Sequence, residues 1–320
     1  MYCLGRAGMD LYPEPAGVIT EDAEHFIADM GGSAGNIAVA LSRQGGRAAL
    51  LTVFSDDQVG RFVLRKCAGY GVDTSLCRTQ PGLCRNSLAI AETKPVDAAV
   101  VIYRNQAADL ELNIDDVKSV DFTGAGGLVV TGTALSGEPS ASAVSAAISA
   151  AKQAGCPVII DIDYRANAWE TARHAARRMA SEVVRADILV GNDDEFAVLC
   201  GADKDEGLAA AREFAASGQL VLYKMGEQGC RSFYQDCEIQ TGIFPVALAK
   251  PFGAGDAFLG NVLTRLGQDG DIRVAVIQGS AAAAFVVARP GCASAMPDKQ
   301  QLSQFMAQNQ MLFFDSQTRG

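Results

Sequence analysis

The residues best suited to chemistry lie near the C-terminus, in the run Gly253-Ala254-Gly255-Asp256. Apolar residues with helical spacing follow from 259 to 266, so the run begins a helix. The first N–H groups of a helix have no intrahelical partner and carry the positive end of its dipole. An acid in a first turn is also an ordinary cap. The glycines let phosphate oxygens approach the backbone, which favours an anion hole with the acid Asp256 beside it.

A second glycine turn, Gly31-Gly32-Ser33, lies near the N-terminus and also precedes a segment with helical spacing. Asn36 follows within the first helical turn, and its amide can both donate to and accept from sugar hydroxyls. Ser and Asn are common helix-capping residues as well. Taken alone, this turn leaves both interpretations open.

Composition narrows the classes of partner. The chain has 320 residues and a net charge of -10, which argues against binding to nucleic acid or to anionic membranes. No apolar stretch is long enough to span a bilayer. The N-terminus lacks the basic and apolar regions of a secretory signal, so we expect a cytoplasmic protein. Nine scattered cysteines and two histidines predict reduced core thiols and no structural metal.

The order of predicted elements indicates the fold class. From residue 127 onward apolar strands alternate with helices, which predicts a mostly parallel sheet flanked by helices. Two strand-rich intervals, about 11 to 30 and 87 to 104, interrupt the first half and are expected to pair into a small sheet that acts as a lid. We therefore predict one α/β domain over residues 1 to 297, followed by a C-terminal helix and tail over 298 to 320.

Four motifs in order carry a resemblance to a known family. They are the Gly31-Gly32 turn with Asn36 and the stretches 56 to 60, 224 to 229 and 253 to 256. Together they resemble the ribokinase-like (PfkB-type) carbohydrate kinases over about residues 1 to 297. This resemblance implies a doubly wound α/β fold with a β lid, which transfers the γ-phosphoryl group of ATP to a primary alcohol.

The resemblance also implies roles for individual residues. Asp256 takes the proton of the hydroxyl, and the amides of Gly253, Ala254 and Gly255 stabilise the charge that develops on the phosphoryl group. Asn192 and Glu195 match a motif that organises Mg²⁺ and phosphate, with Glu195 acting indirectly; a capping pair is the alternative. The residues expected along the nucleotide are Asn192, Lys224, Gly226, Gly229 and Gly255.

Within the family the chain most resembles the 5-dehydro-2-deoxygluconokinases of inositol catabolism, through residues 5 to 12, 103 to 109 and 161 to 165 with Trp169. An acid sugar agrees with Arg104 and Arg165, which each follow a predicted strand and suit a carboxylate. The expected substrate-binding residues are Asp10, Gly32, Asn36, Arg104 and Arg165. Kinases of 2-dehydro-3-deoxygluconate, fructose or ribose are the nearest alternatives.

One position departs from the family pattern. Many members have an Asp that helps to hold a monovalent cation where this chain has Lys250, followed by Pro251. We expect the Lys250 ammonium to replace that cation, so dependence on potassium is in doubt.

Two functions of other classes are weighed against a kinase. A non-catalytic sugar-binding regulator of the same fold would lose the base or the anion hole, and this chain has both. A nicotinamide oxidoreductase is disfavoured by the glycine spacing. A lid sheet with an exposed apolar face often pairs between subunits, so we expect a homodimer through the lid.

Overall fold

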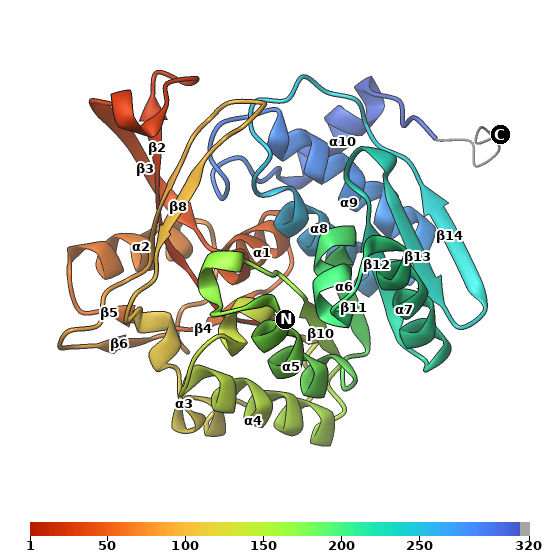
Figure 1. Ribbon diagram of the computed structural model, residues 1–320, viewed down its shortest axis with the longest axis horizontal. Coiled ribbons are helices and arrows are strands. Elements are labelled where there is room, and N and C mark those ends of the chain that lie inside the picture. Colours follow the sequence, from red (N-terminus) through yellow and green to blue (C-terminus); the bar gives the residue numbers. More distant parts are fainter. Residues whose placement is uncertain (314–320) are drawn as a thin grey trace.

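The computed structural model describes residues 1–313, apart from the side chain of Asp269. A central sheet of eight strands forms its framework (Figure 1). The strands are β1 Tyr2–Leu4, β4 Ala49–Leu51, β9 Leu128–Thr131, β10 Val158–Asp161, β11 Ile188–Asn192, β12 Leu220–Lys224, β13 Cys230–Tyr234 and β14 Cys237–Thr241. Their order across the sheet is β14-β13-β12-β11-β10-β9-β1-β4.

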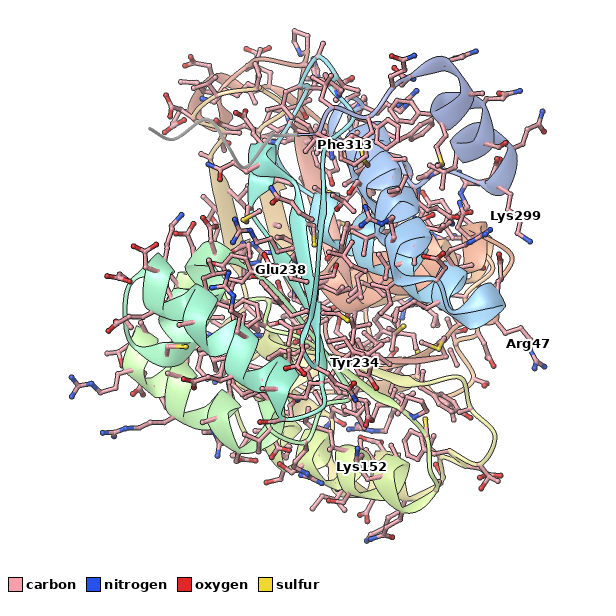
Figure 2. All side chains as sticks on the ribbon, turned by 90° about the vertical axis from the view of Figure 1, so that its right-hand side faces the viewer. Arg47, Lys152, Tyr234, Glu238, Lys299 and Phe313 are labelled. Atoms are coloured by element: carbon pink, nitrogen blue, oxygen red, sulfur yellow. The ribbon has the colours of Figure 1, made fainter. Side chains whose placement is uncertain are left out.

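Every strand pair between β4 and β12 is parallel, whereas β13 and β14 add an antiparallel edge. Figure 2 looks onto this edge, where Tyr234 and Glu238 mark the two edge strands. All four residues of β9 and of β10 are buried, as expected of parallel strands covered on both faces. The predicted mostly parallel α/β class is therefore confirmed.

Helices cover the two faces of the sheet and build two separate cores. One core holds residues of α1 Ser33–Arg43, α2 Gln58–Gly69, α8 Ala254–Asp269, α9 Ile272–Val287 and α10 Lys299–Gln308. The other holds residues of α3 Ile114–Lys118, α4 Ser140–Gln153, α5 Ala172–Val183, α6 Asp193–Cys200 and α7 Lys204–Ala216. No helix in the described part of the chain is long and apolar enough to cross a membrane.

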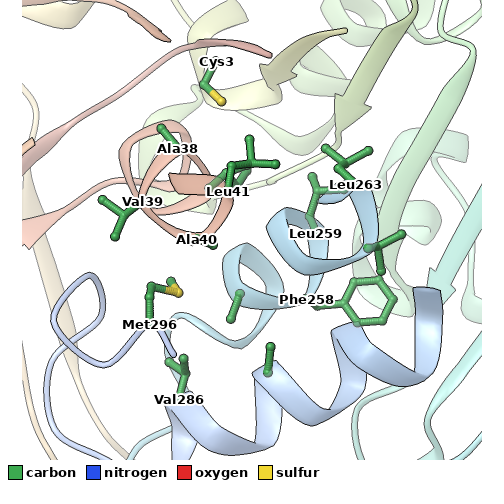
Figure 3. Close-up of a cluster of buried hydrophobic side chains, with 14 of the residues drawn as sticks. Cys3, Ala38, Val39, Ala40, Leu41, Phe258, Leu259, Leu263, Val286 and Met296 are labelled. Carbon is green, nitrogen blue, oxygen red and sulfur yellow. The ribbon is translucent and has the colours of Figure 1, made fainter. Parts of the chain in front are cut away.

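Helices α1 and α8 approach closely because small residues face each other. A β-carbon added to Gly260 of α8 would lie 2.5 Å from Cβ of Ala40 and 3.1 Å from the carbonyl oxygen of Ile37, both on α1. Figure 3 shows the buried side chains around this contact, among them Leu41 and Leu259. The close approach brings the N-terminal turns of the two helices together.

A second sheet of four strands stands apart from the central one (Figure 1). Its strands are β2 Gly8–Glu14, β3 His25–Gly31, β7 Leu88–Ala91 and β8 Val100–Tyr103, in the order β3-β2-β7-β8. They come from the two intervals that were predicted to pair, so the small separate sheet is confirmed. Its action as a lid stays a prediction.

Two expectations need correction. The mostly apolar run from 48 to 54 predicts a single strand, but the chain leaves the central sheet after Leu51 and forms β5 Val53–Ser55, which pairs with β6 Arg78–Gln80. Both halves are buried, so hydrophobicity alone could not locate the break. The cysteines are free thiols, but Cys200 and Cys237 are exposed and not in the core. Part of the predicted C-terminal tail, residues 314 to 320, lies outside the described residues.

Candidate active site

The candidate site lies at the carboxyl ends of the parallel strands, where open α/β sheets bind ligands. Asp161 is the last residue of β10, Asn192 of β11 and Lys224 of β12. Because neighbouring parallel strands end at the same edge, these three polar side chains reach one region. Helices α1 and α8 pack in the core on one face of the sheet, and their first turns border the same region.

The predicted anion hole forms at the N-terminus of α8. Gly253 is the N-cap and has a φ of 81°, a left-handed conformation that favours glycine. A β-carbon there would also lie 3.2 Å from Sγ of Cys292, so the space beside the turn is filled. The first intrahelical bond runs from Ala257 N to Gly253 O. The N–H groups of Ala254 and Gly255 therefore have no intrahelical acceptor and can bind an anion.

Asp256 lies in the first turn of α8 and is only 8% exposed. Burial, together with the charge of Asp163, raises the pKa of Asp256 to about 7. Asn36 on α1 counteracts this rise, because its Nδ2 donates a hydrogen bond of 2.8 Å to Oδ2 of Asp256. A carboxylate with a pKa near 7 is well matched to accept a proton from a hydroxyl at neutral pH.

Lys224 brings a positive charge to the same place. A β-carbon added to Gly255 would lie 3.2 Å from Nζ of Lys224, so the ammonium group sits directly beside the anion hole. Its nearest carboxylate is that of Asp161, with Nζ 3.6 Å from Oδ1. Burial disfavours the ammonium form, but the charges of Asp161 and Glu195 outweigh it and raise the pKa of Lys224. The side chain is therefore a permanent cation suited to phosphate.

Asn192 and Glu195 form a reciprocal capping box on α6. The N–H of Glu195 donates to Oδ1 of Asn192 at 2.8 Å, and the N–H of Asn192 donates to Oε2 of Glu195 at 2.7 Å. This contact gives the pair a structural role. Burial nevertheless raises the pKa of Glu195 to about 7. A cation bound nearby would lower that pKa and favour the ionised carboxylate.

The two glycines predicted along the nucleotide differ in their surroundings. Gly226 begins a short 3-10 turn, Gly226–Gln228, and a β-carbon added to it would meet no atom within 4 Å. A β-carbon on Gly229 would lie 2.1 Å from the carbonyl oxygen of Thr241. Both have positive φ angles, 56° and 84°. Gly229 is therefore required by the fold, whereas Gly226 leaves open space beside the end of β12.

On the lid side, Asp10 and Gly32 lie where β2 and β3 meet the first turn of α1. Asp10 is 6% exposed, and its Oδ2 accepts a hydrogen bond of 3.1 Å from the hydroxyl of Tyr12. Its Oδ1 is buried without a hydrogen-bond donor among the described residues. Gly32 is the N-cap of α1 with a φ of 93°. A β-carbon there would lie 2.5 Å from the carbonyl oxygen of Arg6, so glycine is required.

Arg104 and Arg165 both line one small cavity. Arg165 pairs with Asp163, with Nη2 2.9 Å from Oδ1, and this charge raises the pKa of Arg165. Arg104 is held firmly: it pairs with Asp109 and its Nη1 also donates to the carbonyl oxygen of Thr133 at 2.9 Å. Both guanidinium groups line the cavity, but their freedom to bind a ligand differs.

Lys250 is fully buried below the anion hole. Its Nζ donates to the carbonyl oxygens of Phe252 at 2.6 Å and Val286 at 3.4 Å. Burial lowers the pKa of Lys250, while the carboxyl groups of Asp256 and Asp10 and the thiol of Cys292 counteract the effect. The ammonium group thus occupies a position surrounded by carbonyl oxygens.

Several residues of the site were not among the predicted ones: Arg6, Ser33, Thr133, Asp161 and Asp163. Asp161 and Asp163 had a usable signal, because two acids that follow a fully apolar strand stand at the carboxyl edge of a parallel sheet. Arg6 had a weaker one, since it lies two residues after the end of β1. Thr133 and Ser33 belong to residue types too common in loops to be singled out.

A larger hollow lies elsewhere in the described structure. It has a volume of about 510 Å³ and is lined by residues such as Lys152, Arg185 and Gln219, at the amino ends of β10, β11 and β12. Ligands of parallel α/β sheets bind at the opposite edge. We therefore assign the site to the region around Asp256.

Comparison with known proteins finds relatives along nearly the whole chain. The model of the pfkB family of carbohydrate kinases matches residues 1–299. The 5-dehydro-2-deoxygluconokinase of Photobacterium profundum is 38% identical over 308 residues, covering 95% of this chain and 93% of that protein. The 5-dehydro-2-deoxygluconokinase of Geobacillus kaustophilus is 32% identical over 311 residues, covering 96% and 93%.

Solved structures share the fold. A Vibrio cholerae fructokinase double mutant with bound fructose, ADP and potassium ion is 26% identical, with a TM-score of 0.84 over 95% of this chain and 97% of that one. A Xylella fastidiosa fructokinase with bound ATP has a TM-score of 0.85 at 22% identity, covering 96% of this chain and 98% of that one. At this lower identity the second likeness supports the fold alone.

Proposed function

Because this chain belongs to the pfkB family of carbohydrate kinases, we propose that it transfers the γ-phosphoryl group of ATP to the terminal hydroxyl of 5-dehydro-2-deoxygluconate, an intermediate of myo-inositol catabolism. One observation carries the chemistry: Asp256, with its pKa raised to about 7, lies beside free helix amides and the Lys224 ammonium group. The names of the relatives at 38% and 32% identity support the substrate.

Each group has a part in the transfer. Asp256 accepts the proton of the terminal hydroxyl as the hydroxyl oxygen attacks the γ-phosphorus, and the bond from that phosphorus to the bridging oxygen breaks to release ADP. The amides of Ala254 and Gly255, with Gly253 shaping the turn, stabilise the charge on the phosphoryl oxygens. Lys224 neutralises the same charge from the strand side. The nucleotide then extends past Asn192 and over the open face of Gly226 and the turn that ends at Gly229.

We infer that Mg²⁺ accompanies ATP at the strand ends. The buried Oδ1 of Asp161 faces Nζ of Lys224 at 3.6 Å, longer than a hydrogen bond, so it could also serve a cation. The charge of Glu195 acts on the same Lys224. Mg²⁺ is commonly held by one or two carboxylates plus substrate phosphates, and Glu195 can act through a water. The ion would neutralise charge on the transferred group.

The sugar is expected between Asp256 and the lid. Asp10, Gly32 and Asn36 line its polyol part, and the guanidinium groups of Arg104 and Arg165 lie at its carboxylate end. A carboxylate could engage the donors of Arg165 that Asp163 does not occupy, whereas a neutral sugar could not form that charged contact. This difference favours the keto acid over fructose or ribose; 2-dehydro-3-deoxygluconate, also an acid, remains the closest rival.

The outer face of the lid supports a homodimer. The registers place Leu11, Ile90 and Val101 side by side in one row, and Tyr103 lies on the same face. Val101 is 44% exposed and Tyr103 57%, so an apolar surface is left uncovered in the monomer. We infer that a second copy covers it, and light scattering that gave the mass of a monomer would contradict this. We also expect the protein in the cytoplasm.

Release of ADP tests the substrate. The purified protein is assayed with 5-dehydro-2-deoxygluconate, 2-dehydro-3-deoxygluconate, fructose and ribose under identical conditions. The expected result is the highest kcat/KM with the first. Equal or better turnover of another sugar would reject this substrate but keep the kinase, whereas sugar binding without ADP release would point to the non-catalytic regulator.

A further inference from the structure

The small cavity at the arginines has the chemistry of an anion subsite. Its volume is about 20 Å³, room for a group the size of a carboxylate but not for a whole sugar acid. The polar residues around it are Arg6, Ser33, Arg104, Thr133, Asp163, Arg165 and Asn167. Three guanidinium groups thus line one space. The N–H donors that each group does not already use within the protein decide which of them can bind a ligand.

Most N–H donors of Arg104 are already engaged within the protein. Its Nε and Nη2 both donate to Oδ2 of Asp109, and its Nη1 donates to the carbonyl oxygen of Thr133 and to Oγ of Ser136. The side chain is only 9% exposed. A guanidinium group has five N–H donors. Arg104 therefore forms a neutral, fixed wall of the cavity together with its Asp109 partner.

Arg165 is freer but already has a carboxylate. Its Nη2 lies 2.9 Å from Oδ1 of Asp163, whose Oδ2 accepts a hydrogen bond from Thr133. Asp163 is 3% exposed, so this pair is fixed at its acidic end. The positive charge of Arg165 is thus balanced locally, although it keeps donors that can reach a ligand.

Arg6 is the guanidinium group with the most unused capacity. Its one side-chain hydrogen bond among the described residues runs from Nη1 to Oγ of Ser87 at 3.2 Å. Its charge also acts on the buried carboxyl of Asp10, whose pKa it lowers against the larger effect of burial, but the two form no ion pair in the described chain. It is nevertheless held in place. A β-carbon on Gly8 would lie 3.0 Å from Nη1, so the bare glycine makes room for the group, and the N–H of Gly35 donates to the Arg6 carbonyl oxygen at 3.2 Å.

We propose that Arg6 binds the carboxylate of the substrate, as the cation that gives this site its preference for a sugar acid, with Arg165 as the second donor. The position is suitable because the loop between β1 and β2 joins the central sheet to the lid. Its carboxylate ligand would also lie at the first turn of α1, where Ser33 lines the cavity and helix N–H groups favour an anion. The inference rests on the proposed function.

The test compares two substrates that differ only at one end. One is 5-dehydro-2-deoxygluconate, and the other is its neutral analogue, with a hydroxymethyl group in place of the carboxylate. In Arg6→Gln the ratio of kcat/KM for the acid to that for the analogue is expected to fall roughly 10- to 100-fold, the scale of a charge-assisted hydrogen bond. The loss should lie mainly in KM for the acid.

Two further variants guard against a merely structural effect. Arg6→Lys keeps the charge but not the planar fork, and should restore part of the selectivity. Arg104→Gln, which removes a wall that both substrates share, should lower kcat/KM for both by similar factors. If Arg6→Gln affected both substrates equally, or kept the wild-type selectivity, the inference would be wrong. A wild-type enzyme that preferred neutral sugars would instead reject the proposed substrate.

Discussion

Asn36 Nδ2 donates a hydrogen bond of 2.8 Å to Oδ2 of Asp256 across 220 residues of sequence. Both side chains are buried, at 4% and 8% exposure. The bond joins the first turn of α1 to the first turn of α8 and leaves Oδ1 of Asp256 free to accept the proton of a hydroxyl. The side-chain amide of Asn36, which was predicted to bind the substrate, thus also orients the base. Because it donates a hydrogen bond to the carboxylate, it favours the ionised form of Asp256.

Replacement of Asn36 by Ala should move the acid limb of the pH–rate profile. The Asn36 bond lowers the pKa of Asp256, against the larger effect of burial. Without it the base holds its proton more tightly, so the limb near pH 7 should shift upward by roughly one unit, the scale of a hydrogen bond to a charged group. A profile of kcat/KM from pH 5.5 to 9 measures this. An unchanged limb with lower kcat would mean that the bond only orients the base.

Replacement of Asp256 by Asn should separate activity from stability. Without the base, kcat should fall by roughly 10²–10⁴ while affinity for ATP changes little. The pKa of Asp256 is raised from 3.8 to about 7 in the folded state. Its contribution to stability is therefore full below about pH 4 and is lost as the pH rises through 7.

The stability side of this prediction needs two pH values. Asp256→Asn carries no ionising group at this position, so relative to wild type its free energy of unfolding should be higher at pH 8 than at pH 5, measured by denaturant titration. Glu195 titrates over the same range in both proteins and cancels in the comparison. Near-wild-type turnover would refute the role of the base, and an equal difference at both pH values would refute the raised pKa.

The sequence predicted the parallel sheet because its strands are short apolar runs set off by turns. β9 and β10 are buried on both faces, so every residue carries the signal. The break after Leu51 gave no such signal, since Val53 and Phe54 are as apolar and as buried as the strand before them. Hydrophobicity reports burial, whereas the choice of partner strand depends on distant residues.

The site was predicted to a similar extent. Asp256 and Lys224 belong to local motifs, and these motifs alone were enough to place one beside an anion hole and the other along the nucleotide. The bond between Asn36 and Asp256 and the pairing of Arg104 with Asp109 depend on how helices and loops pack, which no local pattern encodes. Whether a guanidinium group is free for a ligand depends on its partners in the fold, which is why Arg104 and not Arg6 was singled out.

Gly260 lies one helical turn beyond Asp256 on α8. Its replacement by Ala should reduce activity although the residue does not itself take part in the reaction. Its β-carbon would lie 2.5 Å from Cβ of Ala40, so α1 and α8 must move apart. We expect a loss of about 1–3 kcal/mol in stability, as for overpacked cores, and a lower kcat because Asn36 recedes from Asp256. Thermal unfolding and steady-state kinetics measure the two effects.

Gly267, on the same helix, provides the matched control. A β-carbon there meets no atom within 4 Å, so Gly267→Ala should stabilise the helix by up to about 1 kcal/mol and leave kcat unchanged. If Gly260→Ala behaved like Gly267→Ala, the spacing of the two helices would not control the base.

The position of Lys250 predicts that activity does not depend on which monovalent cation is present. Its ammonium group is held by the carbonyl oxygens of Phe252 and Val286, whereas the Vibrio cholerae fructokinase mutant was solved with a potassium ion bound. With a fixed cation in place, wild-type kcat should be the same in potassium, sodium and tetramethylammonium chloride at equal ionic strength. Severalfold activation by potassium would contradict the substitution of a lysine for the ion.

Replacement of Lys250 by Met tests whether its charge acts on the anion hole. Met keeps most of the apolar stem and removes the ammonium group, so packing around Val286 is largely preserved. We expect a loss in kcat below the roughly 10²–10³-fold caused by removal of a donor that contacts the reacting oxygens, because Lys250 acts through the turn at Gly253. Affinity for ADP, measured by calorimetry, should fall less than kcat does, since the charge is needed most when phosphoryl oxygens become more negative. Equal losses in both would indicate that Lys250 only supports the fold of the turn.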